Sequence, residues 1–190
     1  IGSVKIGGTA DDGVNYAPKY RNPTNGEGTQ QLRLNYGDDG RAEVMLDVNN
    51  NIFVAACTQS GDFPVRGAFQ PTSGGGQDGV IIKFDPNITT LMASSYIGGA
   101  GSDALFSVAI SPTTNLLYAT GGTMSTNIPG AGGPSSGAIG PTNHGVVDGL
   151  ITMIRDNGAS LSLMAVRYFG TTTTDMIYGV QVDAKGFPYV

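Results

Sequence analysis

Residues 96–110 read YIGGAGSDALFSVAI, and the pattern of this stretch occurs three times in the 190-residue chain. The other copies begin at Tyr36 and Tyr168. Each copy carries an aspartate five positions before a valine, and these pairs are Asp39 and Val44, Asp103 and Val108, and Asp175 and Val180. Steps of 64 and 72 residues separate the valines. Self-similarity at such a spacing predicts tandem structural units that pack on their neighbours.

A second repeated element lies between these copies, since residues 78–84 (DGVIIKF) match residues 148–154 (DGLITMI). In the second unit, period-2 alternation and apolar runs predict four strands. These strands are residues 105–110, 116–121, 149–155 and 161–168. Residues 111–115 (SPTTN) and 156–158 (DNG) are typical turn sequences between them. No stretch has helical periodicity, and residues 123–147 are rich in Gly, Pro, Ser and Asn, as a long surface loop would be.

Units of four short strands without helices predict an all-β fold, and the tandem arrangement favours a β-propeller segment of four-stranded antiparallel blades with long inter-strand loops. The alternative is a tandem β-sandwich. Residues 1–36 are expected to end a preceding blade, and residues 37–97 and 98–168 to form two blades, the second with a long loop at 123–147. Residues 169–190 then begin a further blade. Because propellers typically carry about 4–8 blades, we expect a fragment of a larger protein that continues beyond Ile1 and Val190.

The composition excludes several classes of function. Charged residues make up 13% of the chain, the net charge is -5 and the pI is near 4.6. With its few Lys and Arg residues scattered singly, the chain has no basic surface for a nucleic acid. No run approaches the roughly 18 apolar residues of a membrane-spanning helix. Cys57 is the single cysteine, which excludes an internal disulfide framework and a Cys-rich zinc site.

Few residues suit catalysis. His144 is the only histidine and lies in a turn-rich stretch, which favours a solvated loop residue. Cys57 lies on a predicted strand, where a small buried side chain fits better than a nucleophile. Residues 74–76 are three glycines without the Lys-Ser/Thr and helix of a phosphate-binding loop. Tryptophan, the largest platform for stacking a sugar, is absent.

The recurring aspartates fit turns better than a metal site. Asp78 and Asp148 each open a predicted strand and are each followed by glycine, and Asp side chains accept backbone N–H bonds in turns. No Asp-x-Asp-x-Asp-Gly loop occurs, although the pairs at residues 11–12 and 38–39 could assist a loose calcium site. We therefore expect no cofactor, with calcium as the alternative.

The sequence resembles a known family over about residues 36–190. Residues 57–65 (CTQSGDFPV), 67–71 (GAFQP), 74–79 (GGGQDG) and 95–99 (SYIGG) are similar, in the same order, to the bacterial SBBP-type β-propeller repeat. In the second unit, residues 125–129 (STNIP) depart from the family's Asp-Phe-Pro turn. Such repeats are common in exported proteins of the Bacteroidetes type, which are associated with gliding motility and type IX secretion. The resemblance implies an extracellular or outer cell-surface location on a Gram-negative bacterium, but implies no activity.

We therefore expect a non-catalytic scaffold or protein–protein interaction module of a large secreted or cell-surface protein. The alternative is an adhesin whose loops bind a surface polysaccharide or a partner protein, and a propeller enzyme comes third. Loops on a rigid frame are where binding is usually placed. The candidate interaction residues are Gln59, Asp62, Arg66, Gln70, Asn127, Asn143 and His144.

Overall fold

The computed structural model describes residues 2–13, 42–132 and 139–190, and these residues form antiparallel β-sheets without a helix. The first sheet contains β1 (Glu43–Leu46), β2 (Ile52–Thr58), β3 (Asp78–Phe84) and β4 (Leu91–Ile97) in chain order. The second contains β5 (Asp103–Ile110), β6 (Leu116–Thr123), β8 (Asp148–Asp156), β9 (Leu161–Phe169) and, at its edge, β7 (Ile139–Gly140). A short hairpin of β10 (Gln181–Val182) and β11 (Pro188–Tyr189) follows. The predicted all-β class is confirmed, and so are the four strands of the second unit, which lie within two residues of their expected bounds.

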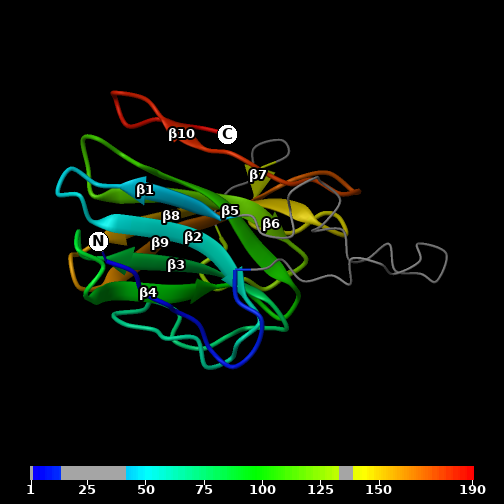
Figure 1. Ribbon diagram of the computed structural model, residues 1–190. Coiled ribbons are helices and arrows are strands. Elements are labelled where there is room, and N and C mark those ends of the chain that lie inside the picture. The colour runs from blue at the N-terminus through cyan, green and yellow to red at the C-terminus, as the bar shows by residue number, and fades with distance from the viewer. Residues whose placement is uncertain (1, 14–41, 133–138) are drawn as a thin grey trace.

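The two sheets stack face to face (Figure 1). We call the face of a sheet that points toward the next unit of the chain its trailing face, and the opposite face its leading face. The trailing face of the first sheet, with Phe53 and Ile81, shares one buried cluster with Val108 and Leu117 on the leading face of the second. Val80 and its neighbours, which alternate with Ile81 along β3, belong to a separate cluster on the leading face of the first sheet. Strand β3 thus contributes to two packing layers, which explains why it is buried along its whole length.

Aspartates close the hairpin turns at one end of the sheets. The Asp47 carboxylate accepts the backbone N–H groups of Asn49 and Asn51, each at 2.8 Å. Asp183 accepts the N–H groups of Lys185 and Phe187 in the same way, each at 2.9 Å. Corresponding bonds are made by Asp85 and Asp156. These turns follow the tendency of Asp side chains to replace a backbone acceptor.

The long loop between the second and third strands of each unit lies along the outermost strand. In the first unit, Arg66 and Ser94 exchange backbone hydrogen bonds of 3.2 and 2.8 Å, and the Tyr96 N–H donates to Gln70 O at 3.2 Å. In the second unit, β7 pairs with the end of β9. An uncovered outer strand would offer unpaired backbone groups to other chains. The loops therefore protect the sheet edges.

The N-terminal segment joins the first sheet. Residues 6–13 (IGGTADDG) match residues 97–104 (IGGAGSDA), and Asp12 pairs with Thr58 as Asp103 pairs with Thr123. The register then continues from Glu43, which lies opposite Ala55. Asp12, rather than the predicted Asp39, thus takes the place of Asp103 among the described residues, and Asp39 lies outside them. The predicted unit boundary after residue 36 also lies outside them and stays a prediction.

Candidate functional site

Asp62 and Asn127 are two of the predicted interaction residues. Each accepts a backbone hydrogen bond from a segment that links one unit to the next. The Asp62 carboxylate accepts the Thr9 N–H at 2.8 Å, and the Asn127 carbonyl oxygen accepts the Ala100 N–H at 2.9 Å. The two positions correspond, so the departure from the family's Asp-Phe-Pro turn retains the same hydrogen bond. Both side chains lie at the surface, but their acceptor atoms bind the protein's own backbone.

Gln70 and Asn143 are also bonded internally. Buried Gln70 donates from Nε2 to Gly98 O at 3.1 Å and accepts the Gly98 N–H at 3.2 Å. Asn143 donates from Nδ2 to Thr123 O at 3.3 Å and accepts the Gly145 N–H at 2.9 Å. These hydrogen bonds stabilise the conformations of the two loops.

The three remaining predicted residues make simpler contacts. Arg66 donates from its guanidinium to Leu91 O at 3.1 Å, and Gln59 donates its backbone N–H to Asp11 O at 2.9 Å. The His144 backbone N–H donates to Asp148 Oδ2 at 2.8 Å, and the His144 side chain is exposed. The seven residues thus lie along two loops and do not gather into one site.

Asp103 is the centre of a buried network at the junction of the two units. Its carboxylate accepts the Gly99 N–H at 2.8 Å, the Ser125 hydroxyl at 2.7 Å, and the Thr123 hydroxyl. Burial raises the pKa of Asp103 to about 6, even though these three donors favour the charged form. Asp12 with Gly8 and Asp175 with Thr171 repeat the backbone bond of this network, at 2.8 and 2.7 Å. The repeated aspartate therefore joins the end of one unit to the start of the next.

The raised pKa of Asp103 predicts a pH dependence of folding. Its pKa in the folded chain, about 6, exceeds the unfolded value of 3.8, so the folded state binds more protons between these pH values. The contribution of Asp103 to the free energy of unfolding should therefore fall, by about 2 kcal/mol, as the pH rises from about 4 to about 7. This contribution is measured by urea unfolding of the parent and of Asp103→Asn at several pH values. The difference in free energy of unfolding between parent and variant should change between about pH 4 and pH 7. A constant difference would contradict a raised pKa for Asp103.

Asp78 and Asp148 each bury one carboxylate oxygen, Oδ1, without a hydrogen-bond partner. The other oxygen of Asp78 accepts the Ser73 hydroxyl at 2.6 Å and the Gly74 N–H at 2.8 Å. Burial is the largest cause that raises the pKa of both aspartates. Gly98 packs directly against Oδ1 of Asp78, so that a Cβ at residue 98 would overlap this oxygen.

The described residues contain no group of three or more His, Cys, Asp or Glu side chains that could hold a metal ion. Of the aspartate pairs considered for calcium, Asp12 accepts hydrogen bonds on both oxygens, and residues 38–39 lie outside the described part of the chain. Burial raises the pKa of Cys57 to about 12, so its thiol stays protonated and is a poor nucleophile at neutral pH.

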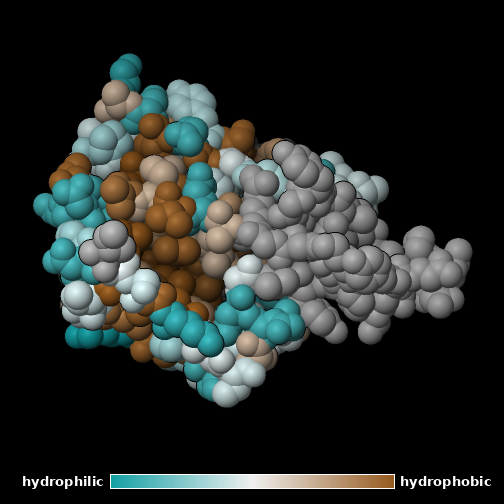
Figure 2. Space-filling view, in the orientation of Figure 1, coloured by the Kyte–Doolittle hydropathy of each residue, from teal (hydrophilic) through white to brown (hydrophobic). Residues whose placement is uncertain are grey.

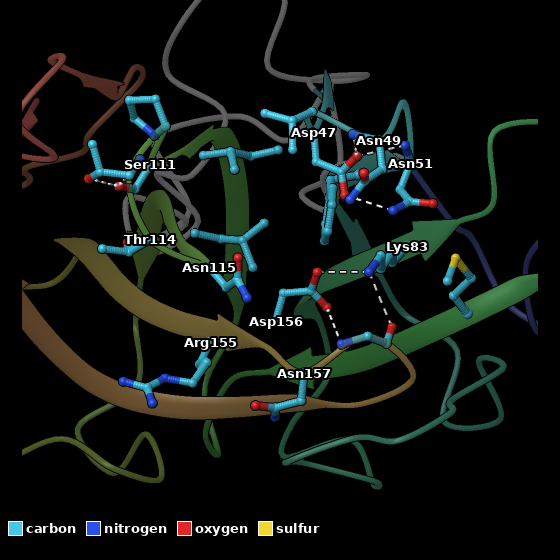
Figure 3. Close-up of a pocket in the computed structure, with 18 residues that line it drawn as sticks. Asp47, Asn49, Asn51, Lys83, Ser111, Thr114, Asn115, Arg155, Asp156 and Asn157 are labelled. Atoms are coloured by element: carbon cyan, nitrogen blue, oxygen red, sulfur yellow. Dashed lines mark hydrogen bonds and ion pairs between the residues drawn. The ribbon is translucent and has the colours of Figure 1, made fainter.

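A cleft that the sequence did not predict lies between the two sheets, at the end where the hairpin turns meet (Figure 3). Its volume is about 680 Å³, and it is lined by residues from the β1–β2, β5–β6 and β8–β9 turns. The exposed Arg155 and the side chains of Asn49, Asn115 and Asn157 supply hydrogen-bonding groups. Such a lining suits a polar ligand, since amide and guanidinium groups can bond hydroxyl, carbonyl or carboxylate oxygens.

Lys83 forms the floor of this cleft and joins the two sheets. Its side chain is 3% exposed, and its Nζ donates to Asp156 Oδ2 at 2.7 Å and to Gly158 O at 3.2 Å. Nζ also lies 5.3 Å from the ring centroid of Phe53. The ammonium group is therefore bonded within the protein, and the ligand-binding capacity of the cleft comes from its rim. A lysine in an apolar strand gives no indication in the sequence that its partner lies on another sheet.

Comparison with protein-family models, with curated proteins and with solved structures gives no match to this chain. Within the described residues, no helix has the length and apolar character needed to cross a membrane.

Proposed function

We propose that this chain is a β-propeller segment acting as a non-catalytic scaffold or interaction module. The arrangement is supported by contacts between the first strands of successive units, which belong to different sheets. The Glu43 carboxylate of β1 accepts the Val108 N–H of β5 at 2.8 Å, and the Ser107 hydroxyl of β5 accepts the Val180 N–H at 3.0 Å. Glu43 and Ser107 are matching positions, as are Val108 and Val180. The same step therefore relates the first unit to the second and the second to the third, as expected of consecutive blades.

We propose a non-catalytic role because of the hydrogen bonds that the aspartate carboxylates make. Asp12, Asp103 and Asp175 accept hydrogen bonds from backbone and hydroxyl donors of the chain itself, and the unpaired oxygens of Asp78 and Asp148 are buried. Catalytic carboxylates instead need an oxygen aimed at a substrate. The resemblance to the SBBP-type repeat supports a secreted or cell-surface location on a Gram-negative bacterium, where a rigid repeat can present partner domains or bind partner proteins.

Hydrolysis assays with glycan and peptide libraries test the non-catalytic proposal. We expect no turnover above the uncatalysed rate. Turnover that Asp103→Asn or His144→Ala abolishes, while Asp47→Asn leaves it unchanged, would overturn it.

Adhesion through the cleft is the second candidate. The polar rim around Arg155 favours it over adhesion through the two loops, where five of the seven candidate side chains bond groups of the chain itself. The ligand in this case is a polysaccharide or a polar peptide segment. Screening of immobilised bacterial glycans and peptides with the 190-residue chain should give a hit that Arg155→Ala weakens about tenfold, which corresponds to the loss of one charged hydrogen bond. Arg66→Ala is the matched control, because Arg66 is an exposed arginine outside the cleft. Equal losses in the two variants would contradict binding in the cleft.

A further inference from the structure

The charged groups of the cleft between the two sheets leave one cation without a counterion. The charged side chains that line the cleft are Asp47, Lys83, Arg155 and Asp156. Lys83 pairs with Asp156 at 2.7 Å, and the Asp47 carboxylate accepts N–H groups of its own turn. Within the described residues, the exposed Arg155 guanidinium has no hydrogen-bond or ion-pair partner. Because a guanidinium binds a carboxylate through two parallel hydrogen bonds, a ligand with a carboxylate fits this end of the cleft.

The uncharged part of the lining suits a peptide backbone. Asn49 and Asn115 are exposed on turns of different sheets, and their side-chain amides make no hydrogen bond within the described part of the chain. A primary amide both donates and accepts, as do the N–H and C=O groups of an extended peptide. Figure 2 shows mostly hydrophilic residues at the left of the view, where the hairpin turns lie in Figure 1. The volume of about 680 Å³ lies within the range of about 300–1,000 Å³ that is typical of ligand sites.

The apolar part of the lining favours a peptide over a sugar. Among the described residues that line the cleft, Phe53 is the only aromatic one, and it is 1% exposed with Lys83 Nζ 5.3 Å from its ring centroid. A sugar ring stacks on an exposed aromatic face, and this lining does not offer one. Val48 in the β1–β2 turn is 88% exposed and offers an aliphatic surface to an apolar side chain.

We propose that the cleft binds an extended acidic segment of a partner protein. A glutamate or aspartate of the segment pairs with Arg155, the backbone of the segment bonds the amides of Asn49 and Asn115, and an apolar side chain contacts Val48. Both sheets contribute, because Arg155 and Asn115 belong to the second sheet, whereas Asn49 and Val48 belong to the first. The inference rests on the interaction role in the proposed function, and it names the chemistry of the partner.

An array of immobilised octapeptides, probed with the 190-residue chain, tests this inference. Each peptide that carries a glutamate is paired with counterparts that carry glutamine or lysine at the same position. We expect the bound peptides to be acidic. Fluorescence anisotropy of a labelled binder should then show about tenfold weaker binding of its glutamine counterpart. The affinity for the glutamate peptide should also fall as salt is added, because Arg155 is exposed.

Variants of Arg155 show whether the peptide binds in the cleft. Arg155→Ala should weaken binding of the glutamate peptide about tenfold and leave the glutamine counterpart unchanged, because that counterpart makes no ion pair. Arg155→Glu should reverse the preference, so that the lysine counterpart binds more tightly than the glutamate peptide. Arg66→Ala, at an exposed arginine outside the cleft, should leave both affinities unchanged. Circular dichroism of each variant shows whether it is folded.

Two results would overturn the acidic peptide as the ligand. One is an array without acidic preference, or with binding that survives Arg155→Ala. The other is binding of oligogalacturonate, lost in Arg155→Ala, without binding of any peptide, which would make the cleft a polysaccharide site. Peptide binding that survives Arg155→Ala would still support an interaction module, with its site elsewhere on the chain. Failure of the proposed non-catalytic role is seen separately, as turnover in the hydrolysis assays.

Discussion

Replacement of Gly98 by alanine is expected to lower the free energy of unfolding by about 4 kcal/mol, at the upper end of single-substitution effects. A Cβ at this position would overlap Asp78 Oδ1 and lie 2.7 Å from Asp78 Cγ and 2.9 Å from Asp103 Oδ2. Both carboxylates are buried and tied to hydrogen-bond donors, so neither moves without losing its bonds. The same requirement recurs at Gly170, whose Cβ would lie 2.6 Å from Asp148 Cγ.

Urea unfolding measures this effect, with Gly61→Ala as the control. Gly61 is exposed, and a Cβ added there meets no atom within 4 Å. The control should change the free energy of unfolding by less than about 1 kcal/mol. If Gly98→Ala lowers the free energy of unfolding no more than Gly61→Ala does, the close packing between Gly98 and Asp78 does not stabilise the junction between the sheets.

Lys83→Met, which removes the ammonium group, should lower the free energy of unfolding by about 3 kcal/mol. The change leaves Asp156, whose side chain is 17% exposed, without its cation, and it removes the hydrogen bond to Gly158 O. Methionine has a suitable volume here, since Met153 holds the matching position in the second sheet. The loss is therefore expected to come from the unpaired carboxylate, with little contribution from a cavity.

A double-mutant cycle separates these causes. Asp156→Asn in the Lys83→Met background should recover part of the stability, because the uncompensated charge is removed. Lys185→Met, at an exposed lysine in the β10–β11 turn, is the control and should change stability by less than about 0.5 kcal/mol. Additive losses in the cycle would show that Lys83 and Asp156 contribute independently, contrary to the bond between them.

The strands of this protein follow from the sequence. Apolar runs and alternation place β5, β6, β8 and β9, because a strand with buried faces needs such residues along its whole length. The repeat predicts that the aspartates serve every unit alike, and Asp103 and Asp175 do accept the same backbone bond. In both cases the determining interaction is local or is copied in each unit.

Tertiary structure decided the rest. The matching of Asp39 with Asp103 relied on spacing, but Asp12 makes the contact with Thr58, and 30 residues separate it from Glu43 at the start of β1's ladder. The predicted interaction loops lie along the outer strands, since side chains such as Asp62 and Gln70 bond chain segments 53 and 28 residues away. The cleft and its lysine depend on how one sheet stacks on the next. Sequence periodicity reports which side of a strand is buried, whereas the partner that buries it is set by packing between units distant in the chain.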